Sequence, residues 1–242
     1  MKNNNLGIFL QARMGSTRLP GKIFELISGK TALKMLVDNI KKTEFGDNLY
    51  VLTSINSTDD VVEKFAKREN LKYFRGSEKD VLDRFYQAAI KFKIFDILRL
   101  TGDCPFLSMK VLTDNIDQYY NHMRPDYYWV NGYPRGLGDA ELFTFEALSM
   151  SYKLTAKQHY REHVVTYILD HPDKFKVVVE KAPAKYRRSN IRLTLDEQAD
   201  LDLLRAVASK LNGKTDLDSI IELFNKEPGL VLINKRVRQK IV

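Results

Sequence analysis

Short apolar runs alternate with amphipathic stretches through the first half of the chain. The apolar runs, which predict buried strands, span residues 6–10, 48–53, 71–74 and 95–101. The stretches with apolar positions every three or four residues, which predict helices, span residues 31–42, 59–69, 78–92 and 108–122. Four strand–helix units in a row imply a mostly parallel sheet covered by helices on both faces, so we expect an α/β fold.

The pattern changes after residue 124. Residues 125–141 are rich in aromatic residues, glycine and proline and have no helical period, so we expect a loop or an irregular strand laid over the sheet. The later pattern predicts helices over residues 145–150, 156–170, 197–211 and 216–224, and strands over 175–180 and 191–195. Because no linker rich in proline, glycine or serine divides the chain, we expect a single domain over residues 1–242 with an inserted segment at about 125–190.

The composition is that of an ordinary globular protein, with 44% hydrophobic and 29% charged residues among 242. Cys104 is the only cysteine, which excludes an intrachain disulfide. No apolar run approaches the ~18 residues that a membrane helix needs, and the apolar run near the N-terminus is too short for a secretion signal. We therefore expect a cytoplasmic protein with no membrane partner.

The net charge of +8 favours anionic partners. The densest basic run, at residues 235–240, is more typical of a solvated tail than of a nucleic-acid patch. The chain carries no recognisable nucleic-acid-binding module, so we expect no nucleic-acid partner.

The segment after the first predicted strand combines cations with residues that form loops. Arg13, Arg18 and Lys22 lie there among hydroxyl residues, a proline and glycines, which let a backbone approach a ligand closely. Such a loop at the end of the first strand of an α/β fold suits a polyphosphate. It is not a Walker A loop, because five residues separate Gly15 from Gly21 where that motif has four. The composition alone also fits a basic surface loop.

Two aspartates follow predicted strands at positions suited to a metal ion. Asp103 comes just after residues 95–101, and Asp196 follows residues 191–195. Ligands of open α/β sheets bind outside the carboxyl ends of the strands, where such carboxylates can bridge Mg²⁺ to phosphate. The alternative is that each aspartate only caps the next helix. Cys104 is expected to be a buried structural thiol, because no histidine lies close to it in sequence.

Six short motifs together resemble a known enzyme family. They lie at residues 11–22, 80–85, 99–105, 143–148, 161–164 and 192–197. They are similar to motifs of the cytidylyltransferases that make CMP-activated acidic sugars, above all the spore-coat polysaccharide biosynthesis protein F type. CMP-sialic acid, CMP-pseudaminic acid and CMP-Kdo synthetases belong to the same group. The resemblance extends over roughly residues 6–210.

The resemblance implies a Rossmann-like nucleotidyltransferase fold, a three-layer sandwich similar to the GT-A glycosyltransferase fold. It also implies CTP as co-substrate, Mg²⁺ as cofactor, and a homodimer built through the inserted segment. The residues implied to bind the nucleotide are Gln11, Ala12, Arg13, Gly15, Ser16, Arg18, Lys22, Arg75, Asp80, Arg84, Thr101 and Asp103. Arg13, Lys22 and Asp103 are implied to be catalytic, and Asp103 and Asp196 are implied to hold the metal ion.

Two departures from the family pattern concern the acceptor. Residues 136–143 contain one residue more than the family usually has, and the Glu162-His163 motif lacks the Thr-Pro that commonly follows it. A structural role is the simpler alternative for His163. The residues expected to face the acceptor are Asp139, Glu141, Glu162 and His163.

The resemblance therefore implies transfer of CMP from CTP to an acidic sugar, nonulosonate-like or Kdo-like, with release of pyrophosphate, in surface polysaccharide biosynthesis. A nine-carbon sugar acid, an eight-carbon one and a smaller phosphonate or phosphorylated acid remain open as acceptors. The alternative function is a metal-dependent GT-A glycosyltransferase that uses a nucleotide-sugar donor. Such enzymes often carry an Asp-x-Asp pair at a strand end, whereas the pairs at residues 200–202 and 216–218 fall in predicted helical or capping positions.

Overall fold

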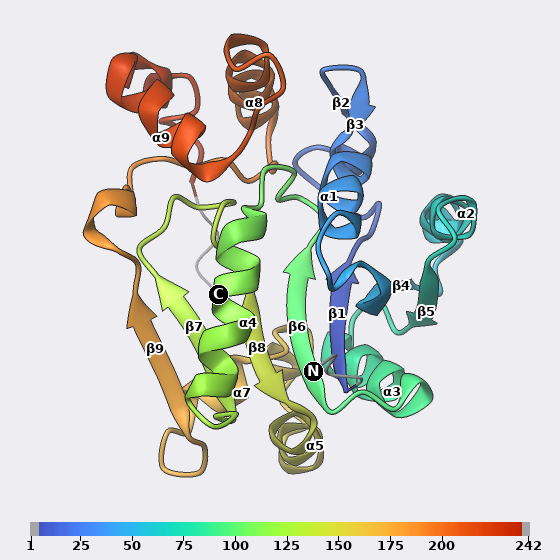
Figure 1. Cartoon of the computed structure of the whole chain (residues 1–242). Coiled ribbons are helices and arrows are strands. Elements are labelled where there is room, and N and C mark those ends of the chain that lie inside the picture. The colour runs from blue at the N-terminus through green and yellow to red at the C-terminus, as the bar shows by residue number, and fades with distance from the viewer. Residues whose placement is uncertain (1–4, 239–242) are drawn as a thin grey trace.

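A seven-stranded sheet forms the centre of the computed structural model, which describes residues 5–238 (Figure 1). The strands of this sheet are β1 (Leu6–Gln11), β4 (Leu49–Ser54), β5 (Lys72–Gly76), β6 (Asp96–Thr101), β7 (Tyr127–Asn131), β8 (Glu141–Thr144) and β9 (Val177–Lys181). Their order is β5–β4–β1–β6–β8–β7–β9. Strand β8 runs antiparallel to both neighbours, and the other neighbouring pairs are parallel. The predicted α/β fold with a mostly parallel sheet is confirmed.

Strand β1 lies inside the sheet because both of its faces are apolar. Leu6, Ile8 and Leu10 pack on one side and Phe9 packs on the other, and all four side chains are fully buried. A strand buried on both faces needs such a continuous apolar run.

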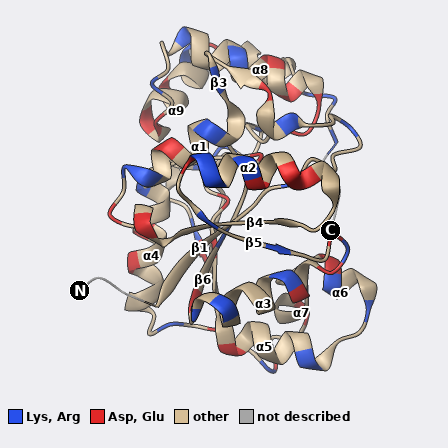
Figure 2. Cartoon of the chain, turned by 90° about the vertical axis from the view of Figure 1, so that its right-hand side faces the viewer, with Lys and Arg blue, Asp and Glu red and all other residues tan. Residues whose placement is uncertain are grey.

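Helices cover both faces of the sheet, which gives the expected three layers (Figure 2). The helices of one layer are α1 (Ala32–Lys41), α2 (Asp60–Arg68) and α4 (Met109–Asn121). Those of the other layer are α3 (Val81–Phe92), α5 (Phe145–Leu154), α6 (Gln158–Glu162) and α7 (Thr166–Asp170). Polar side chains begin several of these helices: Thr31, Ser108 and Thr144 each accept a hydrogen bond from the backbone N–H three residues on.

The last two α-helices form a separate apolar cluster. Helices α8 (Gln198–Lys210) and α9 (Leu217–Lys226) pack with the short helix η5 (Pro228–Leu232) around Phe106 and Leu193. The remaining short elements are η1 (Lys22–Phe24), β2 (Leu26–Ile27), β3 (Lys30–Thr31), η2 (Gly46–Asn48), η3 (Ser57–Asp59) and η4 (Ala184–Tyr186).

The structure corrects the expectation for residues 125–141. This segment is not laid over the sheet, because β7 and the start of β8 are strands within it. Strand β7 pairs with β9, whose residues follow about fifty positions later, as in the pair Tyr127 and Val177. Tyr127 and Tyr128 are buried on opposite faces, as successive residues of a strand are.

Three further boundaries differ from the pattern. The helix expected over residues 156–170 is two helices, because His163 has an extended backbone (φ −116°, ψ 92°) between α6 and α7. The strand expected over residues 191–195 pairs only at the single bridge between Arg135 and Arg192. Helix α3 begins at Val81, because the Asp80 side chain, and not Ser77, accepts from the N–H of the first turn.

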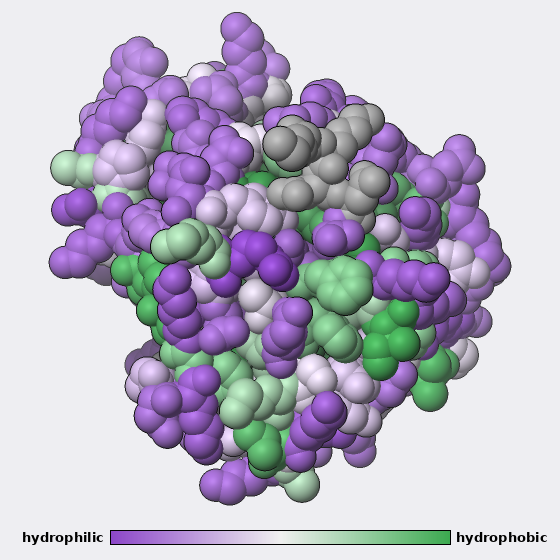
Figure 3. All heavy atoms as spheres, turned by 60° about the horizontal axis from the view of Figure 1, so that its bottom comes forward, coloured by the Kyte–Doolittle hydropathy of each residue, from purple (hydrophilic) through white to green (hydrophobic). Residues whose placement is uncertain are grey.

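Within residues 5–238, no helix is both long enough and apolar enough to cross a bilayer. The lower face around α3, α5 and α7 mixes polar and apolar side chains, and the apolar ones gather in patches (Figure 3). Exposed apolar residues of these helices are Ile90, Met150, Leu154 and Leu169.

Candidate active site

A cavity of about 240 Å³ lies at the carboxyl edge of the sheet. Its lining residues are Gln11, Arg13, Gly15, Ser16, Thr17, Arg18, Lys22, Ile23, Thr101, Gly102, Asp103 and Asp196. They include both predicted metal ligands and most of the residues predicted to bind the nucleotide. Sequence reasoning missed Thr17, Ile23 and Gly102, although each adjoins a predicted site residue. The loop after β1, the end of β6 and the turn before α8 therefore meet around one space.

The loop after β1 is held by a buried carboxylate that sequence reasoning missed. Asp59 Oδ1 accepts from the Met14 N–H at 2.7 Å, and its other oxygen accepts from Ser54. Asp59 is only 2% exposed. In the sequence Asp59 is only the first residue of the helix predicted over residues 59–69, and its side chain makes no cap hydrogen bond. Asp59 instead holds the backbone at Met14, and this anchors the loop that carries Arg18 and Lys22.

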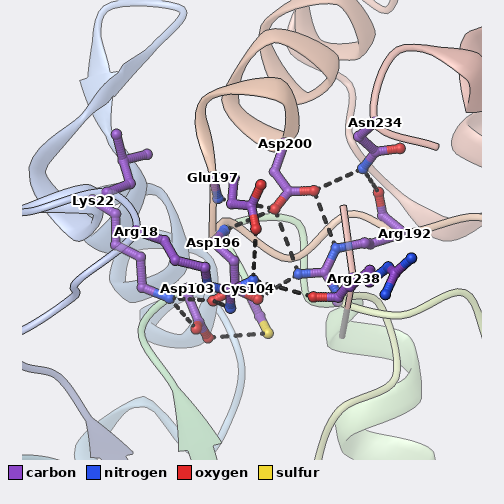
Figure 4. Close-up of polar contacts among 12 residues, drawn as sticks. Arg18, Lys22, Asp103, Cys104, Arg192, Asp196, Glu197, Asp200, Asn234 and Arg238 are labelled. Atoms are coloured by element: carbon purple, nitrogen blue, oxygen red, sulfur yellow. Dashed lines mark hydrogen bonds and ion pairs between the residues drawn. The ribbon is translucent and has the colours of Figure 1, made fainter. Parts of the chain in front are cut away.

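Lys22 connects the two predicted metal ligands. Its Nζ donates to Asp103 Oδ2 at 2.6 Å and to Asp196 Oδ1 at 2.7 Å (Figure 4). Gly21 precedes it with a φ of +69°, a left-handed conformation that glycine adopts without strain. Burial lowers the pKa of the Lys22 ammonium, but the two carboxylates outweigh that effect and raise the pKa above its usual value. Lys22 is therefore charged at neutral pH.

Two arginines also contact Asp196. Arg18 lies 3.2 Å from Asp196 Oδ1 and also pairs with Glu197 at 2.9 Å. Arg192 donates to the other oxygen, Asp196 Oδ2. Burial raises the pKa of the Asp196 carboxyl, but Lys22 and the arginines reverse that effect and lower it below its usual value. Asp196 is ionised, and its two oxygens face different cations.

The two carboxylates fit a magnesium ion that shares its coordination with phosphate. Asp103 and Asp196 already converge on a single cationic nitrogen, with side chains only 23% and 15% exposed. Over residues 5–238, no group of three or more aspartate, glutamate, histidine or cysteine side chains forms a metal cage. Mg²⁺ commonly uses one or two carboxylates and completes its shell with phosphate oxygens and water. The donor set therefore suits a metal that arrives with a nucleotide.

Cys104 matches the expectation of a buried thiol. Its Sγ lies 3.7 Å from Asp103 Oδ1 and 4.0 Å from Asp139 Oδ2. Burial and these two carboxylates raise the pKa of the Cys104 thiol well above its usual value. A thiolate nucleophile is therefore disfavoured at this position.

Four residues predicted to bind the nucleotide do not line this cavity: Ala12, Arg75, Asp80 and Arg84. Ala12 is buried, and its N–H donates to Leu52 in the neighbouring strand. Arg75 joins β5 to α2 through ion pairs with Asp60 and Glu63. Their contacts in the described chain support the fold.

Asp80 is likewise engaged elsewhere. One oxygen caps α3 and the other accepts from Arg161 at 2.8 Å. This ion pair ties α3 to α6.

Arg84 is predicted to bind the nucleotide and has an unusual environment. It is fully buried, and its Nη1 donates to the Ser77 carbonyl at 2.9 Å. Its Nε and Nη2 are buried without a partner among the described residues, as is Gln11 Oε1. Burial, with a smaller contribution from Arg13, lowers the pKa of the Arg84 guanidinium to about 10. Buried polar groups without partners are costly. Gln11 lines the cavity, whereas Arg84 does not.

Two of the predicted acceptor residues are already paired. Glu141 in β8 accepts from Arg99 in β6 and from the Tyr127 hydroxyl at 2.9 Å. Asp139 accepts from the Gly136 N–H in the turn before β8. Burial raises the pKa of the Asp139 carboxyl above its usual value, although the Gly136 N–H opposes this.

The other two predicted acceptor residues lie where α6 ends. Glu162 is exposed and His163 is half-buried. Burial lowers the pKa of the His163 imidazole, and the positive charges of Arg99 and Arg13 act in the same direction. Of these two arginines, Arg13 lines the cavity and Arg99 does not.

The fold and this site define a class of enzyme. Cations after the first strand, opposite two carboxylates at the ends of other segments, are the arrangement expected of a nucleotidyltransferase. A family model described as cytidylyltransferase matches residues 8–236, nearly the whole chain. The protein belongs to the cytidylyltransferase family.

Individual relatives agree with this assignment. The chain is 33% identical to the spore coat polysaccharide biosynthesis protein SpsF of Bacillus subtilis, over 93% of this chain and 96% of the relative. A solved cytidylyltransferase structure from Leptospira borgpetersenii has a TM-score of 0.86 and 33% identity, covering 98% of this chain and 99% of that one. A shorter match, 33% over 42% of this chain and 41% of the relative, links it to 3-deoxy-manno-octulosonate cytidylyltransferase 2 of Hydrogenovibrio crunogenus.

Proposed function

We propose that this protein transfers CMP from CTP to an acidic sugar, with release of pyrophosphate, in the synthesis of a surface polysaccharide. The observation that carries the proposal is the convergence of Asp103 and Asp196 on Lys22, beside the cationic loop after β1. The names of the similar proteins support the rest. One acts in spore coat polysaccharide biosynthesis, and another is a cytidylyltransferase for an eight-carbon sugar acid.

In the proposed reaction, a hydroxyl of the acceptor attacks the α-phosphorus of CTP. The new bond joins the acceptor oxygen to this phosphorus, the bond to the β-phosphate oxygen breaks, and the hydroxyl proton leaves to solvent. Arg13, Arg18 and Lys22 neutralise the charge that develops on pyrophosphate, because preorganised cations stabilise a charge that appears in the transition state. Asp59 keeps their loop in place through Met14.

Asp103 and Asp196 would hold the magnesium ion. When bound, Mg²⁺ would polarise the α-phosphorus by binding its oxygens. Lys22 would then exchange its two carboxylate contacts for phosphate oxygens, since it is a charged ammonium in the same cavity.

Recognition of the base is proposed for Arg84 and Gln11. The unpartnered Nε and Nη2 of Arg84 are donors, and the unpartnered Oε1 of Gln11 is an acceptor. Cytosine presents both acceptors and an amino donor on one edge, so it would satisfy both residues.

The acidic group of the acceptor is proposed to lie near Arg99 and Arg13. Both cations act on the His163 imidazole, so they share its surroundings. Arg99 retains a buried Nε without a partner among the described residues, even though Glu141 occupies its other end. The predicted homodimer stays a prediction.

The reaction is tested by incubating the protein with CTP, Mg²⁺ and a panel of nonulosonic acids, 3-deoxy-manno-octulosonate, phosphonates and phosphorylated acids. Pyrophosphate release and a CMP-linked product of the expected mass are predicted for at least one acceptor, and neither with the acceptor omitted. Transfer of a sugar from a nucleotide-sugar donor, without pyrophosphate, would contradict the proposal and favour a glycosyltransferase.

A further inference from the structure

We infer that the C-terminal arm, residues 234–238, is a working part of the metal site, and that Asn234 is a positioning residue for Asp196. The inference rests on the proposed function, because it gives Asp196 the role of a metal ligand. The basic run that includes this arm was expected to be a solvated tail. Lys235, Arg236 and Arg238 are exposed, as expected of a solvated run, but the arm begins at the buried Asn234 and its Arg238 carbonyl contacts Arg18; Gln239 and Lys240 lie outside the described residues.

Asn234 is the anchor of the arm. It is only 5% exposed, although it follows exposed residues at the end of η5. Its Nδ2 donates to Asp200 Oδ1 at 2.8 Å and to the Arg192 carbonyl at 3.0 Å. Both bonds reach residues more than thirty positions earlier, so a distant part of the chain holds the arm.

Asp200 receives this contact and controls the turn that carries Asp196. Its side chain is fully buried. Asp200 Oδ2 accepts from the backbone N–H of Asp196 at 3.0 Å and of Glu197 at 3.1 Å. Asp200 Oδ1 accepts from Arg192 Nε at 3.1 Å as well as from Asn234. One carboxylate therefore sets both the backbone of the turn and the guanidinium of Arg192.

Arg192 passes this constraint to the side chain of Asp196. The guanidinium lies between the two carboxylates and donates to Asp196 Oδ2 (Figure 4). Asp196 Oδ1 then faces the cavity, where it meets Lys22. The two oxygens of Asp196 therefore have different roles: Oδ2 is held by Arg192, and Oδ1 faces the proposed metal site. Groups that orient a metal ligand in this manner commonly tune metal affinity.

The far end of the arm meets the same site directly. The Arg238 carbonyl accepts from Arg18 Nη1 at 3.2 Å, across 220 positions of sequence. The same guanidinium contacts Asp196 and Glu197. The arm thus contacts the nucleotide–metal site twice, once through the Asp200 network and once through Arg18.

The test measures how much Mg²⁺ is needed for CTP binding, by calorimetric titration of the full chain at a series of Mg²⁺ concentrations. For Asn234→Ala we expect the half-saturating Mg²⁺ concentration to rise by about 10-fold, the lower end of the effect of removing a group that orients a ligand. CTP binding in the presence of EDTA should stay within about twofold of wild type, because Asn234 contacts Arg192 and Asp200 and none of the loop cations directly. Asn225→Ala, an exposed asparagine outside the network, is the matched control and should change neither quantity.

A merely structural role for Asn234 would change metal-free binding and metal-dependent binding together. If wild type binds CTP with a Mg²⁺ dependence that Asn234→Ala leaves unchanged, this inference fails and the proposed function stands. If wild type shows no Mg²⁺-dependent CTP binding, the proposed function fails and the inference fails with it.

A second variant covers the case in which Asn234→Ala does not fold. Arg192→Lys keeps the positive charge but cannot bridge two carboxylates with a planar fork. The same rise in the Mg²⁺ requirement, with metal-free CTP binding retained, supports the inference. An unchanged Mg²⁺ requirement in a folded Arg192→Lys protein contradicts it.

Discussion

The proposed nucleotide side and the proposed acceptor side of this site differ in how their charges are held. On the nucleotide side, Asp103, Asp196 and Lys22 come from distant parts of the chain and meet across a cavity. On the acceptor side, Glu141 is paired with the adjoining strand and Asp139 with its own turn. In the first arrangement the charged cluster faces the cavity. In the second, the charges are paired with neighbouring groups of the fold. We therefore expect the first region to carry out the reaction and the second to determine the shape of the site.

The largest effect is expected from Asp103→Asn. The amide can still accept from Lys22, so the fold should survive, but the charge that would hold the metal ion is lost. Turnover should fall at least about 10²-fold, as for other losses of one preorganised charged group. Pyrophosphate release by the purified variant measures this. Asp114→Asn, which alters an exposed carboxylate on α4, is the control. Near-normal turnover of Asp103→Asn would contradict the assignment of the reaction to the region of Asp103, Asp196 and Lys22.

Lys22→Met tests the cluster of Lys22, Asp103 and Asp196 in an experiment that needs no acceptor substrate. The substitution leaves two carboxylates facing each other in a site that is mostly buried. Breaking such a pair costs about 3 kcal/mol, or about 6–12 °C in Tm for a chain of this size. Mg²⁺ should restore part of the loss in the variant and raise the Tm of wild type less.

The control for that measurement is Lys110→Met, which removes an exposed lysine paired with Asp114. An exposed pair contributes about 0–1 kcal/mol, so its Tm should hardly move. Equal losses in both variants would show that the Lys22 cluster has no special electrostatic role.

Gly136→Ala tests the shape of the acceptor side. Gly136 has a φ of +89°, and a Cβ there would lie 2.6 Å from the backbone of Leu193. The left-handed backbone alone costs about 1–3 kcal/mol for a residue with a side chain, and the close contact adds to it. Chemical denaturation measures the loss.

Gly29→Ala separates strain from contact, because Gly29 has a φ of +80° with open space around it. Gly136→Ala should therefore be the less stable of the two variants. The reverse order would mean that the turn before β8 does not need its close approach to Leu193.

The smallest effect concerns pH. The pKa of His163 is lowered below 6.5, chiefly by burial, so the unfolded chain binds this proton more readily. Stability is therefore lost as the pH falls below about 6.5, down to the lowered pKa of the folded protein. Wild type should lose stability relative to His163→Gln over that range.

The nucleotide side should behave differently in the same titration. The pKa of Asp196 is lowered below 3.8 and that of Lys22 is raised above 10.5. The Asp196 contribution is lost only as the pH falls through its lowered pKa, and the Lys22 contribution only as the pH rises through its raised one. The stability difference between wild type and Asp196→Asn should thus be flat from about pH 5 to 9. A slope within that window would contradict the ionisation of the cluster.

The features that could be predicted depend on residues close together in the chain, and the features that were missed depend on distant contacts. The loop after β1 and Asp103 could be placed at the carboxyl edge of the sheet from sequence, because each directly follows a predicted strand in the chain. Strand β7 was missed, because its aromatic segment becomes a strand only through pairing with β9 about fifty residues later. The α6–α7 break was missed because His163 leaves the helix where buried Val164 and Val165 follow.

Within the site, local sequence also failed where a side chain acts at long range. Asp59 looks like a helix cap but holds the Met14 backbone 45 positions away. Asn234 carries no motif, and its partner Asp200 lies 34 positions away. Arg75, which the resemblance implies to bind the nucleotide, forms ion pairs with Asp60 and Glu63 that join β5 to α2, a structural contact that the motif does not indicate. Such roles depend on tertiary contacts that periodicity does not encode.

The most direct test of the central claim is calorimetric binding of each of the four nucleoside triphosphates to the wild-type protein, with and without Mg²⁺. We expect CTP to bind more tightly than ATP, GTP and UTP, and Mg²⁺ to strengthen its binding through Asp103 and Asp196. Binding that is insensitive to Mg²⁺, or no binding of any triphosphate, would contradict the assignment of this cavity to a magnesium–CTP complex.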